Sequence, residues 1–167
     1  MVVGTADAAH AGGYSPEREQ PLRGYGVLLG TFIGGSGAFA WWLARSGRQV
    51  PERVDPGDLL LVSVAAHKAS RLLTKDRVTG VLRAPFTRFQ DDAGAGEVEE
   101  AARGRGLRLA LGQLLVCPYC IGMWVAAGLT GSLLVAPRFT RWVAFALTAL
   151  TAADFLQVAY RKAEDAL

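Results

Sequence analysis

The chain has 167 residues, of which 51% are hydrophobic and 20 are glycine, and its net charge at pH 7 is +3. This length fits one domain, and this composition favours a bilayer environment over a water-soluble core. The basic residues lie in short segments between apolar runs, as membrane-flanking charges do, whereas a nucleic-acid-binding face would gather them. We therefore expect an integral membrane protein and exclude nucleic acid as a partner.

Composition divides the chain into three parts. Residues 1–23 are polar and contain several glycines, and we expect a flexible tail there because little apolar surface is available for burial. Residues 24–162 hold the apolar runs and predict a helical membrane domain with a cytosolic loop at 74–106. Residues 163–167 are predicted as a short C-terminal tail.

The first apolar run, residues 25–43, has 19 residues without a charge. At about 1.5 Å per residue it can cross a hydrocarbon core of about 30 Å. A cleaved signal peptide is the competing interpretation, but the run is longer than an ordinary signal core, and Trp41 and Trp42 are typical of interfacial anchors. Gly30 and Gly34 place two small residues four apart, a spacing that lets another helix approach closely.

The second run, residues 59–73, is the weakest candidate span because it contains His67, Lys68 and Arg71. Its 15 residues cover only about 22 Å as a helix. Continuation through residues 74–78 would supply the missing length, with the cations snorkelling toward one interface or facing the bundle interior. If this run lies on the surface instead, the chain has three spans.

The third run, residues 107–136, is too long for one simple span. Proline is favoured at the first position of a helix, so Pro118 offers a division. One interpretation has an interfacial turn at 107–116 followed by a span at 117–136. The other has one tilted, kinked helix from residue 109 onward, which would place the cysteines deeper.

A fourth run, residues 142–160, holds one charge, Asp154, and completes a bundle of four spans. With four spans, 11 basic residues fall on one side and 5 on the other. Because loops rich in positive charge stay in the cytoplasm, this bias predicts both termini inside. The predicted cytoplasmic side holds Arg18, Arg23, Lys75, Arg77, Arg83, Arg88, Arg103, Arg105, Arg108, Arg161 and Lys162. The opposite side holds Arg45, Arg48, Arg53, Arg138 and Arg141.

This topology brings polar groups from three runs to a similar depth in the cytosolic half of the membrane. The predicted cluster contains His67, Lys68, Arg71, Cys117, Cys120, Trp124 and Asp154. Helical spacing puts His67, Arg71 and Lys75 on one face. Asp154 is the expected counter-charge for Arg71 or His67, either in a functional site or as a buried pair that only fixes helix packing.

Cys117 and Cys120 are the only cysteines, and they lie inside the third run. At a helix N-terminus the dipole stabilises a thiolate, and this spacing allows a disulfide across one turn, which is the redox interpretation. The Cys-Pro-Tyr-Cys sequence looks like a glutaredoxin active site, but no strand–helix–strand pattern surrounds it, so a thioredoxin fold is excluded. In a redox role Cys117 would attack, Cys120 would resolve, and His67 or a nearby base would take the proton.

Two other interpretations of the thiols stay open. They could supply half of a tetrahedral zinc site, completed by His67 and Asp154 or by a second copy of the chain. They could also be inert apolar residues, since reduced thiols are expected on a cytoplasmic side, and a permanent disulfide is the least favoured state for the same reason. The site assignment therefore includes no metal, and the sequence implies no cofactor.

The stretch 74–88 carries four basic residues beside hydroxyl groups. Such residues just inside a membrane attract anionic lipid head groups or phosphate, although ordinary positive-inside anchoring would also place them there. The predicted lipid-binding residues are Lys75, Arg77, Arg83 and Arg88. Residues 90–106 are acidic, then basic, and rich in glycine, which predicts a mobile cytosolic loop.

Three patterns together resemble a known family. They are HK.SRL..KD at 67–76, RAPFTR at 83–88 and CP.C...W at 117–124. Over roughly residues 58–160 the chain resembles a family of small bacterial membrane proteins, which is catalogued as a domain of unknown function and has a sporulation-associated member. The resemblance implies a multi-pass membrane protein whose family pattern includes the polar groups named above, and it brings no activity.

We therefore predict an all-α fold, an integral membrane bundle of about four helices. No motif names a reaction, so whether the chain is an enzyme stays open, and we favour a small membrane module whose basic loop binds anionic lipid or a protein partner. The alternative is a membrane thiol-disulfide oxidoreductase that uses Cys117 and Cys120. Expected partners are the lipid bilayer, anionic head groups, and a second copy or another membrane protein.

Overall fold

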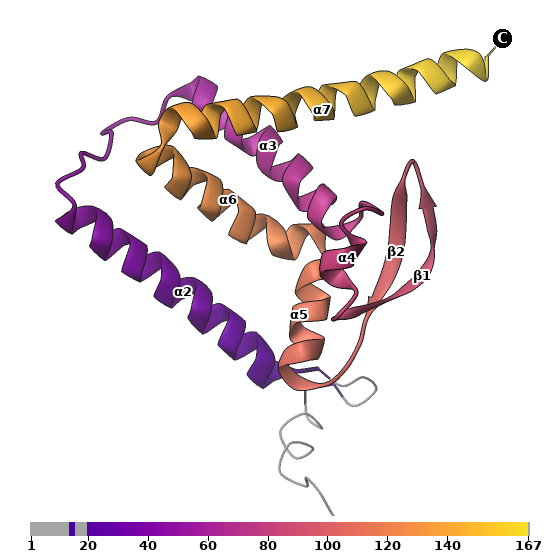
Figure 1. Cartoon of the computed structure of the whole chain (residues 1–167), viewed down its shortest axis with the longest axis horizontal. Coiled ribbons are helices and arrows are strands. Elements are labelled where there is room, and N and C mark those ends of the chain that lie inside the picture. Colours follow the sequence, from indigo (N-terminus) through magenta and orange to yellow (C-terminus); the bar gives the residue numbers. More distant parts are fainter. Residues whose placement is uncertain (1–13, 16–19, 167) are drawn as a thin grey trace, which may run out of the picture.

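Four long helices form the body of the structure, a computed structural model that describes residues 14–15 and 20–166. The long helices are α2 (Leu22–Arg45), α3 (Pro56–Thr74), α6 (Pro118–Val135) and α7 (Pro137–Glu164) (Figure 1). Between α3 and α6 the chain forms short helices α4 (Gly80–Arg83) and α5 (Gly106–Val116) and strands β1 (Thr87–Gly94) and β2 (Glu97–Ala102). Most of the predicted flexible tail, residues 1–23, lies outside the described residues.

Three of these helices, α2, α6 and α7, are long and apolar enough to cross a membrane. They correspond to the first, third and fourth predicted runs, and they confirm a multi-pass membrane protein of the all-α class. Helix α3 has 19 residues, which extend about 28 Å, but its charged side chains keep it outside this group. Its crossing therefore stays a prediction, and the two strands are an addition to the predicted bundle.

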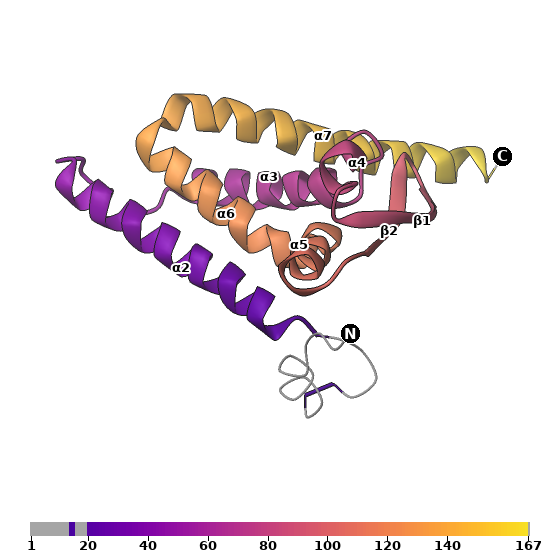
Figure 2. The same cartoon turned by 60° about the horizontal axis from the view of Figure 1, so that its bottom comes forward.

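The long helices alternate in direction. Helices α2 and α6 run one way, and α3 and α7 run the other way, as Figures 1 and 2 show. Helix α3 packs against both α6 and α7, while α2 packs mainly along α5. Helices α4 and α5 and the two strands gather at the end of the bundle where α3 ends and α6 begins.

Prolines mark the points where three of the long helices begin. Pro56, Pro118 and Pro137 each occupy the first position of a helix, where the missing N–H group has no helical partner to lose. Between α5 and α6, Cys117 has extended backbone angles. The third run is therefore two helices divided at Cys117, so the single kinked helix is wrong and the predicted division at Pro118 is confirmed, while the interfacial position of 107–116 stays a prediction.

The expectation of a mobile loop at 90–106 is also wrong, because most of that stretch is a β-hairpin. Strands β1 and β2 pair in an antiparallel sheet, and the turn residues 94–96 all have positive φ angles between 50° and 80°. The glycines that indicated mobility serve here to build a tight turn. The hairpin is held to the end of α3 by the backbone N–H of Val98, which donates to the carbonyl oxygen of Lys75 at 2.8 Å.

The glycine face of α2 is open among the described residues. A Cβ atom built on Gly30 or Gly34 would find no neighbouring atom within 4 Å. Helix α2 reaches α6 through aromatic rings instead, since Phe32 and Trp124 meet edge to face with centroids 5.1 Å apart. Trp124 therefore packs toward α2.

Candidate functional site

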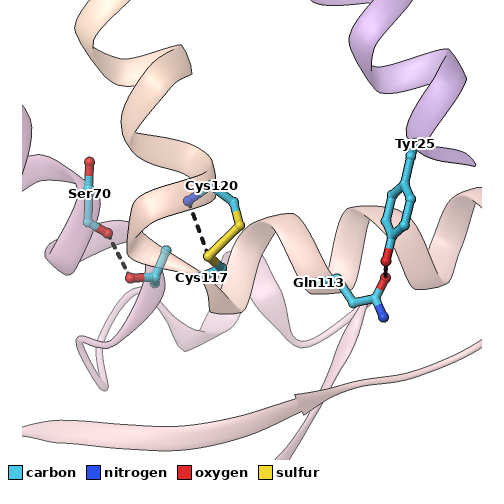
Figure 3. Close-up of a disulfide and its surroundings, with 6 residues drawn as sticks. Tyr25, Ser70, Gln113, Cys117 and Cys120 are labelled. Carbon is cyan, nitrogen blue, oxygen red and sulfur yellow. Dashed lines mark hydrogen bonds between the residues drawn. A yellow bond between two sulfur atoms is a disulfide. The ribbon is translucent and has the colours of Figure 1, made fainter. Parts of the chain in front are cut away.

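Cys117 and Cys120 are joined in a disulfide across the first turn of α6 (Figure 3). Cys117 is the N-cap residue, and its Sγ accepts a hydrogen bond from the backbone N–H of Cys120 at 3.1 Å. Cys117 is half-buried, whereas Cys120 is exposed. The helix dipole and a backbone donor thus favour negative charge on the first sulfur, and the second residue is open to an incoming group.

A cavity of about 280 Å³ lies beside this turn, between α3 and α6. Its lining residues are Ala66, His67, Ser70 and Arg71 of α3 and Pro118, Tyr119 and Gly122 of α6. The two helices approach closely at Gly122, where an added Cβ would lie 3.5 Å from Ser70 Oγ. Pro118 and Tyr119 stand between the two cysteines in the chain, but neither Cys117 nor Cys120 is among the lining residues. Since successive residues of a helix point about 100° apart, the disulfide faces away from the cavity on the first turn of α6.

Some of the predicted site residues line the cavity, and the cavity is also lined by residues that were not predicted. His67 and Arg71 line it, and Trp124 does not. Within the described part of the chain, no hydrogen bond links His67 to either sulfur. Ser70 and Tyr119 were missed, although Ser70 follows His67 by three residues and so shares its helical face, a signal that the sequence contains.

Arg71 connects the cavity to the hairpin. Its Nη2 lies 2.5 Å from Oε2 of Glu97 and its Nε lies 3.1 Å from Oε1 of the same side chain. Glu97 is the first residue of β2, so the hairpin supplies the partner of a cavity-lining cation. Sequence reasoning missed this partner because a mobile loop offers no fixed carboxylate; the alternation of Glu97, Val98 and Glu99 indicates a strand with a polar face.

The predicted pairing of Asp154 with Arg71 or His67 is wrong. Asp154 Oδ2 lies 2.5 Å from Nζ of Lys68, and the Lys68 side chain is 14% exposed. Successive residues of a helix point about 100° apart, so Lys68 reaches α7 while His67 lines the cavity. This ion pair joins α3 to α7.

The hairpin neutralises three of the four predicted lipid-binding residues. The ion pairs are Lys75 with Glu99, Arg77 with Asp92 and Arg83 with Glu100. The lipid assignment of Arg83 is wrong, because its side chain is wholly buried and a head group has no access to it. Arg88 is exposed and makes no ion pair with any described residue.

Glu100 is held in its ionised form. Burial alone would raise its pKa, but hydrogen bonds from Arg83 and Thr87, together with the charges of Arg83 and Lys75, outweigh burial and lower the pKa from its ordinary value of 4.5. The arginine–glutamate pair is therefore a fixed part of the hairpin at neutral pH.

A metal site would need ligands from outside the described residues. Among those residues there is no group of three or more histidine, cysteine, aspartate or glutamate side chains that could hold a metal ion. The open zinc interpretation of the thiols therefore depends on further ligands, such as those of a second copy.

Comparison with known proteins places these features in a family. Sporulation protein YjcA of Bacillus subtilis (strain 168) is 29% identical over 107 residues, which cover 62% of this chain and 91% of YjcA. No solved structure matches the chain. The model of the family described as "Protein of unknown function (DUF1360)" matches residues 61–160, which include the cavity, the hairpin and the cysteine pair. The predicted resemblance is confirmed, and the chain belongs to this family of proteins of unknown function.

Proposed function

We propose that this protein is a membrane thiol-disulfide oxidoreductase that exchanges the Cys117–Cys120 disulfide with thiols that reach the exposed Cys120. The observation that carries the proposal is the position of this disulfide, at the N-terminus of α6 and with Cys120 exposed. A helix N-terminus stabilises a thiolate, and thiolate stability governs exchange rates.

The two sulfurs have distinct roles in this proposal. An incoming thiolate attacks Sγ of Cys120, the S–S bond breaks, and Cys117 leaves as a thiolate that the Cys120 N–H stabilises. A second thiol then displaces Cys120, so two thiols become one disulfide and the protein gains two thiols. The attacked residue differs from the sequence expectation, in which Cys117 makes the external bond, because Cys120 is the exposed residue of the pair.

We also propose that α3 is a fourth crossing and that both termini are cytoplasmic. The alternating directions of the four long helices support this topology. The charge of Lys68 is matched by Asp154, which reduces the cost of placing α3 in the membrane. The end of the bundle with the hairpin also carries most of the basic residues, as expected for the cytoplasmic side.

Thiol labelling in intact cells and inverted vesicles tests the redox role and the topology together. With a membrane-impermeant reagent, we expect labelling only in inverted vesicles, and only after reduction. Cys117→Ser is expected to leave Cys120 reactive without reductant and to abolish exchange, while circular dichroism shows unchanged helix content. The variant that lacks both cysteines is the blank. Labelling that is indifferent to reductant would contradict the redox role, and labelling in intact cells would contradict the orientation.

A second candidate function, binding of anionic lipid, is favoured by a different set of arginines. Arg103 and Arg108 donate to the carbonyl oxygens of Ala84 and Pro85 and so keep their net charge. Arg88 and Arg105 are exposed near them in the chain, at the start of β1 and just before α5. The candidate head-group site therefore consists of Arg88, Arg103, Arg105 and Arg108. Lys75, Arg77 and Arg83 are left out of it because the hairpin neutralises them.

Retention of anionic lipid in nanodiscs tests this second function. Replacing Arg88 and Arg105 together by glutamine is expected to weaken phosphatidylglycerol retention roughly thirtyfold, because each exposed arginine contributes about 1 kcal/mol near an anionic surface. Arg77→Gln is the matched control, since Asp92 already neutralises that guanidinium. If the double variant and the control retained the same amount of phosphatidylglycerol, these arginines would be excluded as the site. Retention that does not change with salt concentration would exclude them as well.

A further inference from the structure

The cavity between α3 and α6 is lined by a cation and by no carboxylate. Its ionisable lining residues are His67, Arg71 and Tyr119. Glu97 holds Arg71 from the hairpin but does not line the cavity, and the disulfide faces the other way on α6. A ligand in this space therefore meets hydrogen-bond donors rather than acidic oxygens or sulfur, which favours an anion over a cation.

Arg71 keeps donors for a ligand although it forms an ion pair. Glu97 accepts from Nε and Nη2, which lie along one edge of the planar guanidinium, and Nη1 donates to no described residue. The pair as a whole is neutral, so its attraction for a distant anion is small. The two N–H groups of Nη1 are available for charge-assisted hydrogen bonds at short range, and Glu97 fixes the orientation of the guanidinium.

Two further donors belong to the same lining. The ring of His67 and the hydroxyl of Tyr119 form no hydrogen bond with any described residue. Tyr119 is also the second residue of α6, so the positive end of that helix dipole lies at the cavity and adds to the attraction for an anion. Donors of three side chains, from two helices, thus line one small space.

The number of donors and the volume together favour a phosphate group. A carboxylate has two oxygens, whereas a phosphate ester presents three acceptor oxygens, which suits donors on three side chains. The volume of about 280 Å³ is slightly below that of an ordinary drug-sized pocket, so a head group fits and a whole lipid does not. Because His67 and Tyr119 are exposed, the cavity opens at the protein surface, and the remainder of the ligand can stay outside.

We infer that this cavity binds the phosphate group of a phospholipid or of a small soluble phosphate ester. Arg71 donates to one phosphate oxygen through Nη1, and His67 and Tyr119 donate to the others. The site is separate from the proposed thiol exchange, because neither cysteine lines the cavity. It is also separate from the candidate head-group site, because none of those four arginines lines the cavity.

Protection of Arg71 from phenylglyoxal tests whether phosphate binds in the cavity. The Arg71 side chain is 42% exposed, so the reagent reaches it, and Arg77, 59% exposed and outside the cavity, is the internal control. The full chain in a maltoside detergent would be given glycerol 3-phosphate or acetate, and separately phosphatidylglycerol or diacylglycerol, before peptide mass spectrometry. We expect a phosphate-bearing compound to slow modification of Arg71 about fivefold relative to Arg77, and acetate and diacylglycerol to have little effect.

The two sources of phosphate give different results in this experiment. Protection by phosphatidylglycerol alone supports a lipid site, protection by glycerol 3-phosphate alone supports a site for a soluble ester, and protection by both supports a site open to either. Three outcomes would overturn the inference. They are no protection by either compound, equal protection by acetate, and modification of Arg77 that slows as much as that of Arg71.

Variants of the lining identify the donors through a second measurement. Broadening of the phosphorus NMR signal of the protecting compound reports its affinity without an arginine to modify. Arg71→Gln is expected to weaken binding about tenfold and Tyr119→Phe about threefold, because each removes donors to the anion, whereas Arg77→Gln should change nothing. Tyr119 is 92% exposed, so its variant keeps the fold even if Arg71→Gln releases the hairpin. Unchanged affinity in Tyr119→Phe and Arg71→Gln would show that phosphate binds elsewhere.

Discussion

Replacing Arg83 by alanine is expected to lower the free energy of unfolding of the hairpin unit by about 3–5 kcal/mol. The side chain of Arg83 is 0% exposed, and that of its partner Glu100 is 8% exposed. Arg83 donates to Glu100 through Nε at 2.9 Å and through Nη2 at 3.1 Å. It also donates to the carbonyl oxygens of Leu73 at 3.0 Å and Asp76 at 2.9 Å, and so joins β2 to the end of α3.

Loss of this guanidinium leaves a buried carboxylate without the arginine that pairs with it and leaves the carbonyl group of Leu73 without its side-chain donor, while the carbonyl of Asp76 keeps a donor in the Thr79 hydroxyl. Removing one partner of a buried pair is far more costly than removing both, because the remaining charge stays desolvated. Hydrogen exchange at the Val98 amide, which bonds to Lys75, would report release of the hairpin, and thermal unfolding in detergent would report the loss of stability.

Arg77→Ala is the matched control for this experiment. Arg77, between α3 and α4, forms an ion pair of similar length with Asp92 of the same hairpin, but the two side chains are 59% and 58% exposed. An exposed pair contributes about 0–1 kcal/mol, so this variant should keep the exchange protection of the hairpin. If both variants released the hairpin equally, burial would not be the source of the stabilisation by Arg83.

The contrast between these arginines shows what the sequence could predict. Apolar runs of sufficient length are a local property, so helices α2, α6 and α7 follow from the sequence alone, whereas the sequence left open whether Pro118 begins a new helix or kinks a longer one. Which of several basic residues becomes buried is a property of tertiary packing. Arg77 and Arg83 look alike in the stretch 74–88, and only the hairpin that folds over one of them distinguishes them.

The hairpin itself escaped prediction because its composition admits two interpretations. Glycine and acidic residues are typical of mobile loops, but glycine also permits the positive φ angles of a tight turn. The structure forms a hairpin because three of its glutamates each pair with one cation that precedes it in the chain. The pairs are Glu97 with Arg71, Glu99 with Lys75 and Glu100 with Arg83. The net charge of a segment does not show which of its residues will form ion pairs.

The rotation of the helices about their axes was the other unknown. Spacing placed His67 and Arg71 on one face correctly, since both line the cavity. It could not tell which α3 residue would face α7, and the neighbouring Lys68 does so instead. A one-residue difference changes the partner of a charge because each residue turns the helix by about 100°.

A second large effect is expected when Gly112 of α5 is replaced by alanine. An added Cβ would lie 2.5 Å from the carbonyl oxygen of Phe86 and 2.9 Å from Cβ of Ala102. The first of these is a backbone atom, so the clash cannot be relieved by rotating a side chain, and α5 must move away from the hairpin. Overpacking of this kind costs about 1–3 kcal/mol or more, which exceeds the gain of up to about 1 kcal/mol in helix propensity.

Gly128→Ala in α6 separates this clash from the propensity effect. A Cβ on Gly128 would find no atom within 4 Å, so thermal unfolding of that variant should be unchanged or slightly later. Helix α5 leads directly into Cys117, and its Gln113 accepts a hydrogen bond from Tyr25 of α2 at 2.6 Å (Figure 3). A displaced α5 should therefore also change the rate at which thiols reduce the disulfide. If Gly112→Ala lowered stability but left that rate unchanged, α5 would support the hairpin without positioning the cysteine turn.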